Sequence, residues 1–310
     1  GSSKGISKES YCSNSEAFIS CALKNLKLFP EGLLVEKYIE GKDITVPFIE
    51  GLGDGGVLAP VEYTGTTRNG INIYDYDMKN DQDNIIGVKC PAEIDENTKI
   101  QLISEMKKIV NILGLNDMAR GDFRVTPSGE IYFIEVNALP SLQKGTAIFE
   151  STKQLGLDYN QTIQAILQSA KKRNRIRPLG VSRTRALKKR LPNLALVYNI
   201  KRKQADDIGH EDEAEFDSPE TIEAIAEAIR FNGFHPILIE ADRDLSKNLQ
   251  KNHIDVVFNI AEGLNKQSRE AQVPAICDLL GIEHTGSDAA CLCITLNKSL
   301  SSKIVQTYLR

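Results

Sequence analysis

The pattern of hydrophobic and polar positions divides the chain into a first region, residues 1–175, and a second region, residues 192–310. In the first region, continuous or alternating apolar runs predict strands at residues 33–39, 44–49, 57–63, 122–126 and 130–137. We expect residues 33–39 to form a buried strand. The last two strands should form a hairpin around Pro127-Ser128-Gly129.

Helical spacing of apolar residues predicts two helices in the first region. One covers residues 15–26, and the other runs from the N-cap Asp95 to the stop residue Gly114. The expected apolar face of the longer helix consists of Ile100, Ile103, the stem of Lys107, Val110 and Leu113.

Strands and helices alternate in the second region. The predicted strands are residues 194–198, 236–240 and 254–260. A helix begins with Ser218 as N-cap and Pro219 as its first residue. This order is typical of a parallel sheet with helices on its faces. We expect residues 206–217 to form a solvated acidic loop.

A basic stretch separates the two regions. Residues 171–190 contain ten Lys or Arg residues and no acidic residue. No aromatic side chains are interleaved with these charges, so base stacking is not favoured. We interpret the stretch as a solvated helix end followed by an interdomain linker.

Composition narrows the class of protein. The length of 310 residues suits about two domains, and the net charge of 38 − 42 = −4 implies no general affinity for nucleic acid. No apolar run is long enough to span a membrane, and the six cysteines include no Cys-x-x-Cys pair. We therefore expect a cytoplasmic protein without a signal peptide, with reduced cysteines and no zinc site, that binds neither nucleic acid nor membranes.

Three oxygen-bearing side chains are candidates for a metal site. Glu135 and Asn137 lie two residues apart in a predicted strand, so they project from the same face, and Asp122 lies on the neighbouring strand. Two carboxylates and an amide oxygen suit Mg²⁺, which prefers hard oxygen ligands. The residues alone leave a second interpretation open, a solvated face of the sheet.

A set of spaced motifs links the two regions. In chain order they are GSSKGISK at 1–8, LLVEKYIEGKDITV at 33–46, YDYDMK at 74–79, ARGDFRV at 119–125, EIYFIEVNALPS at 130–141, LALVYN at 194–199, VFNIAEG at 257–263, REAQVPAICDLLGIEHTGSD at 269–288 and LNK at 296–298. With these motifs the chain resembles the D-alanine–D-alanine ligase family of ATP-grasp enzymes over nearly its whole length.

The resemblance implies an α/β fold in an unusual domain order. The expected units are the later part of an ATP-grasp α+β domain (1–175), a linker (176–191), a small Rossmann-like parallel-sheet domain of the type that precedes an ATP-grasp domain (192–290), and the start of a following ATP-grasp domain (291–310). The second half of one ligase unit would thus precede the first half of another. A piece of a tandem protein, a permuted protein and an omitted segment are the alternatives.

The resemblance also implies roles for single residues. The expected ATP-binding residues are Ser2, Ser3 and Gly5 of the phosphate-covering loop, Glu36, Lys37, Tyr38 and Ile39 of the adenine hinge, Asp43 at the ribose, and Lys79 and Lys298 at the phosphates. Asp122, Glu135 and Asn137 match the Mg²⁺ ligands, which could also hold Mn²⁺. Arg120 matches the arginine that stabilises the acyl phosphate and the tetrahedral intermediate, and the backbone N–H of Ser141 could serve an oxyanion hole.

Substrate binding is implied for four further residues. Lys144 and Thr146 lie near the expected acceptor, where the sequence departs from the Thr-Ser-Pro-Gly-Met-Thr pattern of the family. Glu262 and Glu270 are candidates to line the pocket, with surface or helix-capping roles as the alternative. The family also has an early glutamate that holds the ammonium group of the first substrate, and the sequence does not reveal which residue takes that role.

The implied function is ATP-dependent carboxylate–amine ligation through an acyl phosphate, of the D-alanyl-D-alanine type used in peptidoglycan synthesis and cell wall biogenesis. The substrates would be small amino acids or dipeptides, and the cofactors ATP and Mg²⁺. A non-catalytic Mg-ATP-binding module and one half of a split ligase are the alternatives. We expect a homodimer or an assembly with another ligase-like unit.

Overall fold

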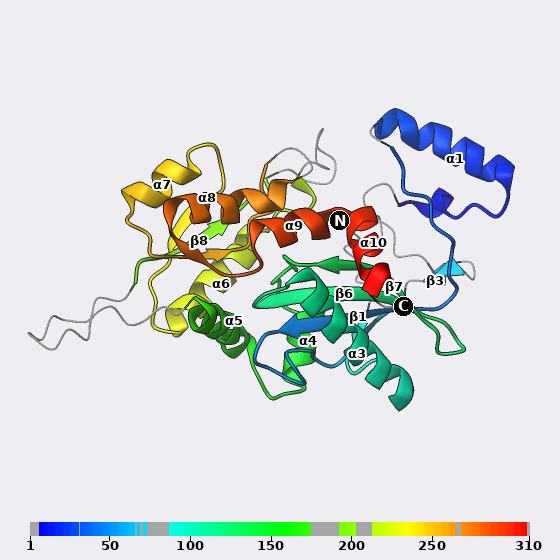
Figure 1. Cartoon of the computed structure of the whole chain (residues 1–310), viewed down its shortest axis with the longest axis horizontal. Helices are drawn as coiled ribbons and strands as arrows, with labels where there is room; N and C mark the ends of the chain where they lie inside the picture. The colour runs from blue at the N-terminus through cyan, green and yellow to red at the C-terminus, as the bar shows by residue number, and fades with distance from the viewer. Residues whose placement is uncertain are drawn as a thin grey trace, which may run out of the picture.

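Two main sheets and the helices around them make up the computed structural model of the chain (Figure 1). The structure describes residues 6–30, 32–65, 67–68, 71–72, 87–174, 192–202, 213–264 and 268–308. The expected linker, residues 176–191, lies outside these ranges. The fold is mixed α/β, as the sequence predicts, and of its two main sheets one is antiparallel and the other parallel.

The antiparallel sheet has five strands in the order β5-β2-β1-β6-β7. The strands are β1 (Lys42–Ile49), β2 (Val61–Thr64), β5 (Gly87–Lys89), β6 (Met118–Val125) and β7 (Ile131–Asn137). The predicted hairpin is confirmed as β6 and β7. The strand predicted at 57–63 forms only from Val61 onward. A two-stranded ribbon, β3 (Thr67–Arg68) and β4 (Ile71–Asn72), follows β2 along the chain.

The parallel sheet of the second region is confirmed. Its strands lie in the order β11-β10-β8-β9, and each neighbouring pair is parallel. They are β8 (Leu194–Tyr198), β9 (Ile237–Glu240), β10 (Val256–Asn259) and β11 (Glu283–His284). Helix α6 (Pro219–Phe231) begins at the expected N-cap, where the Ser218 side chain accepts a hydrogen bond from the Thr221 N–H.

The other described helices are distributed along both regions. They are η1 (Lys8–Ser10), α1 (Ser15–Leu28), α3 (Glu96–Leu113), α4 (Ala147–Lys153), α5 (Tyr159–Arg173), α7 (Leu245–Lys251), η3 (Arg269–Ala271), α8 (Gln272–Leu280), α9 (Ala289–Leu296) and α10 (Lys298–Tyr308). Helices α9 and α10 belong to the second region but contact β7 and α3 of the first. No described helix is long and apolar enough to cross a membrane.

The ends of α3 are predicted correctly, and its buried face is predicted in part, since Leu113 is buried and Ile103 and Val110 pack against the core. Asp95 caps the helix, and Gly114 ends it in the left-handed conformation at φ 67°. The fully or largely buried residues are Thr98, Leu102, Met106, Ile109 and Leu113, whereas Ile100 is 58% exposed. Two apolar stripes with helical spacing run side by side on this helix, and spacing alone does not determine which of them meets the sheet.

The predicted buried strand at residues 33–39 is wrong. The structure shows no regular secondary structure there, and Leu34 and Val35 are 55% and 63% exposed. Helix α1, just before it, buries none of its residues and lies apart from the two sheets in Figure 1. A continuous apolar run predicts burial only if a partner surface covers it, and no described strand pairs with this segment.

Hydrogen bonds from a buried ion pair of the first region, Asp117 with Arg173, join the two regions. Asp117 is fully buried, and its Oδ2 accepts hydrogen bonds from Arg173 Nη2 and from the backbone N–H of Gly286, both at 2.8 Å. Arg173 Nη2 also donates to the backbone carbonyls of His284 (3.0 Å) and Gly286 (3.1 Å). Buried apolar residues of both regions form one cluster beside this contact. The two sheets are therefore held in one fixed arrangement.

Replacing Asp117 should destabilise the protein strongly. Asp117→Ala leaves the Arg173 guanidinium and the Gly286 N–H without their buried acceptor, and we expect a loss of about 3–5 kcal/mol in the free energy of unfolding. The matched control is Asp54→Ala, which removes an exposed ion pair with Lys107 and should cost less than about 1 kcal/mol. Urea denaturation checks both values, and equal losses would contradict the structural role of Asp117.

Candidate functional site

One face of the antiparallel sheet bears charged side chains. Because side chains alternate along a strand, Asp43 and Thr45 on β1 share this face with Arg124 and Asp122, their register partners on β6. Arg124 Nη1 lies 2.9 Å from Asp43 Oδ1. The other face of β6 presents Phe123 and other buried residues to the core.

The hairpin brings the three expected metal ligands together. Asp122 lies directly opposite Glu135, and Asn137 lies opposite Arg120. Arg120 binds both oxygens of Asp122, with Nε donating to Oδ1 at 2.9 Å and Nη2 to Oδ2 at 2.8 Å. The Asn137 Oδ1 accepts a hydrogen bond from the Leu139 N–H at 3.0 Å and retains a second lone pair.

The second region contributes a cation to this face. Lys298, the first residue of α10, places its Nζ 2.8 Å from Glu135 Oε2. Burial disfavours the charged lysine, but the Glu135 carboxylate outweighs burial and raises the pKa of Lys298. The converse holds for Glu135, whose pKa is lowered by Lys298 despite the opposing effect of burial.

The donor set of the hairpin suits a hard divalent cation. Two carboxylates and an amide oxygen converge, and Arg120 and Lys298 neutralise the two carboxylates. Among the described residues, no group of three or more His, Cys, Asp or Glu side chains could hold a metal ion. Asp122 and Glu135 would thus be the only carboxylate ligands of a metal ion here among the described residues, with the amide of Asn137 as a further oxygen ligand.

A cavity of about 350 Å³ lies between the two regions. Its lining from the first region includes Arg120, Glu135, Asn137, Ser141 and Gln143. Its lining from the second region includes Lys201, Glu215, Asp217, Glu262, Glu270 and Lys298. Neither region alone forms this cavity, because the charged sheet face supplies one wall and the parallel-sheet side supplies the other.

The wall from the second region is acidic. Arg269 pairs with Glu215, and its Nη2 also lies 3.5 Å from Glu262 Oε2 and 3.7 Å from Glu270 Oε1. Burial is the main cause that raises the pKa of Glu270 to about 7 and the pKa of Glu262 well above its ordinary range. The neighbouring carboxylates add to this rise, and Arg269 opposes it.

Two acidic residues of this wall contradict the expected solvated loop at residues 206–217. The Glu215 side chain is only 11% exposed, and Asp217 lines the cavity. Both residues lie just before the N-terminus of α6, in the connection that follows strand β8. Acids at the carboxyl end of a parallel strand are a signal for a ligand site, and that signal could have revealed them.

The three residues expected after Asn137 lie in different surroundings. Ser141 lines the cavity. Thr146 donates its hydroxyl to the Gln143 carbonyl at 2.9 Å, and the Lys144 Nζ lies 5.1 Å from the centre of the Tyr159 ring. Neither Lys144 nor Thr146 is among the described residues that line the cavity.

Among the expected nucleotide-binding residues that the structure describes, Asp43 has a buried oxygen that lacks a hydrogen-bond donor. Its Oδ2 is a buried oxygen without a hydrogen-bond partner in the described part of the chain. Burial raises the pKa of Asp43 to about 6, Arg124 opposes the shift and Asp122 adds to it. A buried carboxylate oxygen without a donor is unfavourable, and a ligand hydroxyl would satisfy it.

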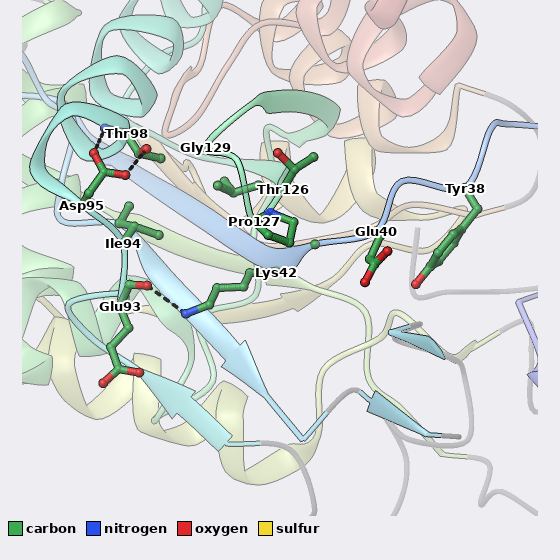
Figure 2. A pocket seen from close by; sticks show the side chains of 12 residues that line it. Tyr38, Glu40, Lys42, Glu93, Ile94, Asp95, Thr98, Thr126, Pro127 and Gly129 are labelled. Carbon is green, nitrogen blue, oxygen red and sulfur yellow. Dashed lines mark hydrogen bonds between the residues drawn. The ribbon is translucent and has the colours of Figure 1, made fainter. Parts of the chain in front are cut away.

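The expected adenine hinge is an exposed segment. Glu36 and Lys37 are exposed, and Tyr38 and Ile39 are half-buried. Tyr38 lines a second cavity, of about 480 Å³, together with Lys42, Glu93 and Asp95 (Figure 2). The two cavities share none of their lining residues. The expected residues Ser2, Ser3, Gly5 and Lys79 lie outside the described ranges.

Known proteins resemble the chain in sequence. Residues 1–168 match the model of a family described as D-ala D-ala ligase C-terminus. The D-alanine–D-alanine ligase of Aquifex aeolicus is 34% identical over 137 residues, which are 44% of this chain and 43% of that relative. The chain spans about half the length of the relatives that it matches.

Solved structures resemble it less closely. A D-alanine–D-alanine ligase from Bacillus anthracis is 22% identical, with a TM-score of 0.42 over 52% of this chain and 50% of that chain. The VanG D-Ala:D-Ser ligase from Enterococcus faecalis is 21% identical, with a TM-score of 0.38 over 50% of this chain and 43% of that chain. Likenesses at this level do not support an argument about the substrate of this chain.

Stability should depend on pH through Asp217. Burial raises the pKa of Asp217 from 3.8 to about 7. The folded state thus favours the protonated carboxyl, and this stabilising contribution is present below pH 3.8 and is lost as the pH rises to about 7. The side chain of Asp217→Asn stays neutral, so the variant does not lose this contribution. Between pH 4 and pH 8 the free energy of unfolding of the wild type should therefore fall by on the order of 3 kcal/mol relative to that of Asp217→Asn.

Urea denaturation at several pH values measures this difference. Glu227→Gln, which removes an exposed carboxylate of α6, should follow the wild type at every pH. Parallel curves for the wild type and Asp217→Asn would contradict the raised pKa of Asp217.

Proposed function

This chain belongs to the D-alanine–D-alanine ligase family, because the match to the family model covers more than half of its residues, and from this premise we propose that it performs ATP-dependent ligation of a carboxylate to an amine. The observation that carries the proposal is the ion pair between Lys298 and Glu135. This ion pair joins the two regions at the cavity that both of them line, and it places the Lys298 ammonium group beside the carboxylates of the hairpin.

Asp122, Glu135 and Asn137 would hold Mg²⁺, or Mn²⁺ in its place. When bound with ATP, the ion neutralises phosphate charge during phosphoryl transfer. The two carboxylates are paired with Arg120 and Lys298. Both cations could turn from these carboxylates toward phosphate oxygens, since a cation of higher charge would then neutralise Asp122 and Glu135.

The nucleotide would extend along the charged face of the sheet. Asp43 would accept hydrogen bonds from the ribose hydroxyls, and its unpartnered buried oxygen supports this role. The exposed segment Glu36–Ile39 would contact the adenine with its backbone. Lys298 would contact the phosphates. We further propose, on the family resemblance, that Ser2, Ser3, Gly5 and Lys79 cover the phosphates.

The chemistry requires an activated carboxylate. Transfer of the terminal phosphoryl group of ATP to the substrate carboxylate forms an acyl phosphate and releases ADP. The amine then attacks the acyl carbon, and phosphate leaves. Arg120 would stabilise the oxyanion of the tetrahedral intermediate together with the backbone N–H of Ser141, because both line the cavity.

The acidic wall would bind the ammonium group of an amino acid. Glu215 is the best candidate for the early glutamate that the family resemblance implies, since it is nearly buried and lines the cavity. Glu262 and Glu270 lie beside it. Lys144 and Thr146 remain candidates for acceptor binding by the resemblance alone. The substrates would be small amino acids or dipeptides, as in peptidoglycan synthesis.

Phosphate release from Mg-ATP by the purified chain tests the proposed function. The panel should contain D- and L-alanine, D-serine, other D- and L-amino acids, and dipeptides. Release that depends on one amino acid, with formation of a peptide detected by mass spectrometry, supports ligation. Binding of Mg-ATP without amino-acid-dependent release would contradict ligation by this chain and favour a nucleotide-binding module.

Loss of either hairpin carboxylate should abolish turnover. Asp122→Asn and Glu135→Gln each remove one negative charge from the proposed metal site, and we expect kcat to fall at least about 100-fold. Glu130→Gln, at an exposed position just before β7, is the control and should keep kcat within about twofold. The kcat of all three variants is measured by phosphate release at saturating Mg-ATP. A wild-type kcat in Asp122→Asn would contradict the metal assignment.

A further inference from the structure

Arg269 lies at the centre of three carboxylates from different parts of the second region. Its guanidinium pairs with Glu215 of the connection before α6, with Glu262 after β10, and with Glu270 of η3. All four side chains are nearly buried, with 21% of Arg269 exposed and between 10% and 15% of each glutamate. One cation therefore links three separate chain segments into the acidic wall.

The three glutamates form the cavity side of this group. Glu215, Glu262 and Glu270 all line the cavity, whereas Arg269 is not among the described residues that do so. The guanidinium of Arg269 is already paired with these carboxylates. We therefore expect Arg269 to act on a ligand mainly through the three carboxylates.

The charges of this group do not balance. Three carboxylates face one guanidinium, so the fully ionised group has a net charge of −2 in a largely buried place. Their mutual repulsion costs free energy there, and an incoming ammonium group would reduce it. The group is thus complementary in charge to a cationic ligand. When no such ligand is bound, the charge of Arg269 favours the ionised form of the three carboxylates.

We propose that Arg269 is a positioning residue for the amino-acid substrate, which holds Glu215, Glu262 and Glu270 together so that they receive the substrate's ammonium group. The proposal rests on the proposed function, since it concerns the part of the same cavity that would bind the substrate's ammonium group. Arg269 acts here in two ways. It fixes the positions of the carboxylates, and its charge lowers the pKa of Glu262 and Glu270 against the opposing effect of burial.

Other charged groups act on the same carboxylates. Glu262 faces Glu215, Glu270 and Asp217 in addition to Arg269, and all three acids raise its pKa. Glu270 faces Glu215 and, across the cavity, Glu135. Arg269 lowers the pKa of both Glu262 and Glu270. Without Arg269 these pKa values rise further, and a higher pH is needed to ionise the wall.

Three variants test the proposal. Arg269→Gln removes the charge, and Arg269→Lys retains it. The control, Arg230→Gln, removes an exposed arginine of α6 that pairs with Glu223 and is not among the described residues that line the cavity. For each one, KM and kcat for the amino acid and the dissociation constant by calorimetry are measured between pH 6 and pH 9. The probes are D-alanine, L-alanine and D-serine, with thermal unfolding as the check on folding.

The expected result is a shift of the pH profile. A rise of one unit in a carboxyl pKa lowers its ionised fraction about tenfold at lower pH, so we expect Arg269→Gln to raise KM and the dissociation constant about tenfold at pH 7. The defect should shrink toward pH 9, while kcat changes less than about threefold. Arg269→Lys should recover most of the affinity, and Arg230→Gln should equal the wild type.

A pH-independent loss of affinity in folded Arg269→Gln, or no loss, would overturn the proposal. So would the absence of binding heat for every amino acid with the wild type. Amino-acid binding with the expected pH shift, but without phosphate release, would support the role of Arg269 and contradict the proposed ligation. If Arg269→Gln does not fold, the decision passes to Arg269→Lys, for which wild-type affinity supports the proposal and a loss equal at all pH values contradicts it.

Discussion

The buried carboxylate of Asp117 is the constraint on which the rest of the structure depends. It accepts hydrogen bonds from Arg173 at the end of α5 and from the backbone of Gly286 in the second region. Asp117 has a left-handed backbone at φ 60°, a conformation that is unfavourable for most residues other than glycine, asparagine and aspartate. The contact therefore fixes both the direction in which β6 starts and the place where the parallel sheet docks. Arg120 and Asp122 follow within five residues, so the same contact sets the position of the charged sheet face relative to Lys298.

The cavity between the regions has two walls of opposite design. On the hairpin side each carboxylate has its own cation, Arg120 for Asp122 and Lys298 for Glu135. On the other wall three glutamates share Arg269. The hairpin side is therefore balanced in charge, whereas the other wall has an excess of acid. The electrostatic environment of the cavity thus differs from one side to the other.

Local signals in the sequence predict much of this arrangement, and long-range packing explains the rest. Helix α6 has its N-cap and its first proline where the pattern places them, because cap chemistry is a property of neighbouring residues. The pairing of Asp122 with Glu135 follows from a short hairpin in the same way. The buried face of α3 and the exposure of residues 33–39 depend on which distant surfaces are present, and no local pattern contains that information. The local sequence around Glu215 and Asp217 is typical of a solvated acidic loop. Their place in the cavity lining depends on residues that are distant in the sequence.

The contacts that join the two regions link residues very far apart along the chain. Asp117 and Gly286 are 169 positions apart, and the hydrogen bond from the Asn116 N–H to Ser287 spans 171. Contacts of such separation require a large loop to close, whereas hairpins and helices form from neighbouring residues. The cavity depends on these distant contacts, because its lining comes from both regions. Any opening between the two regions would therefore expose Glu135, Glu215 and Glu262 to water while each sheet kept its own strands paired.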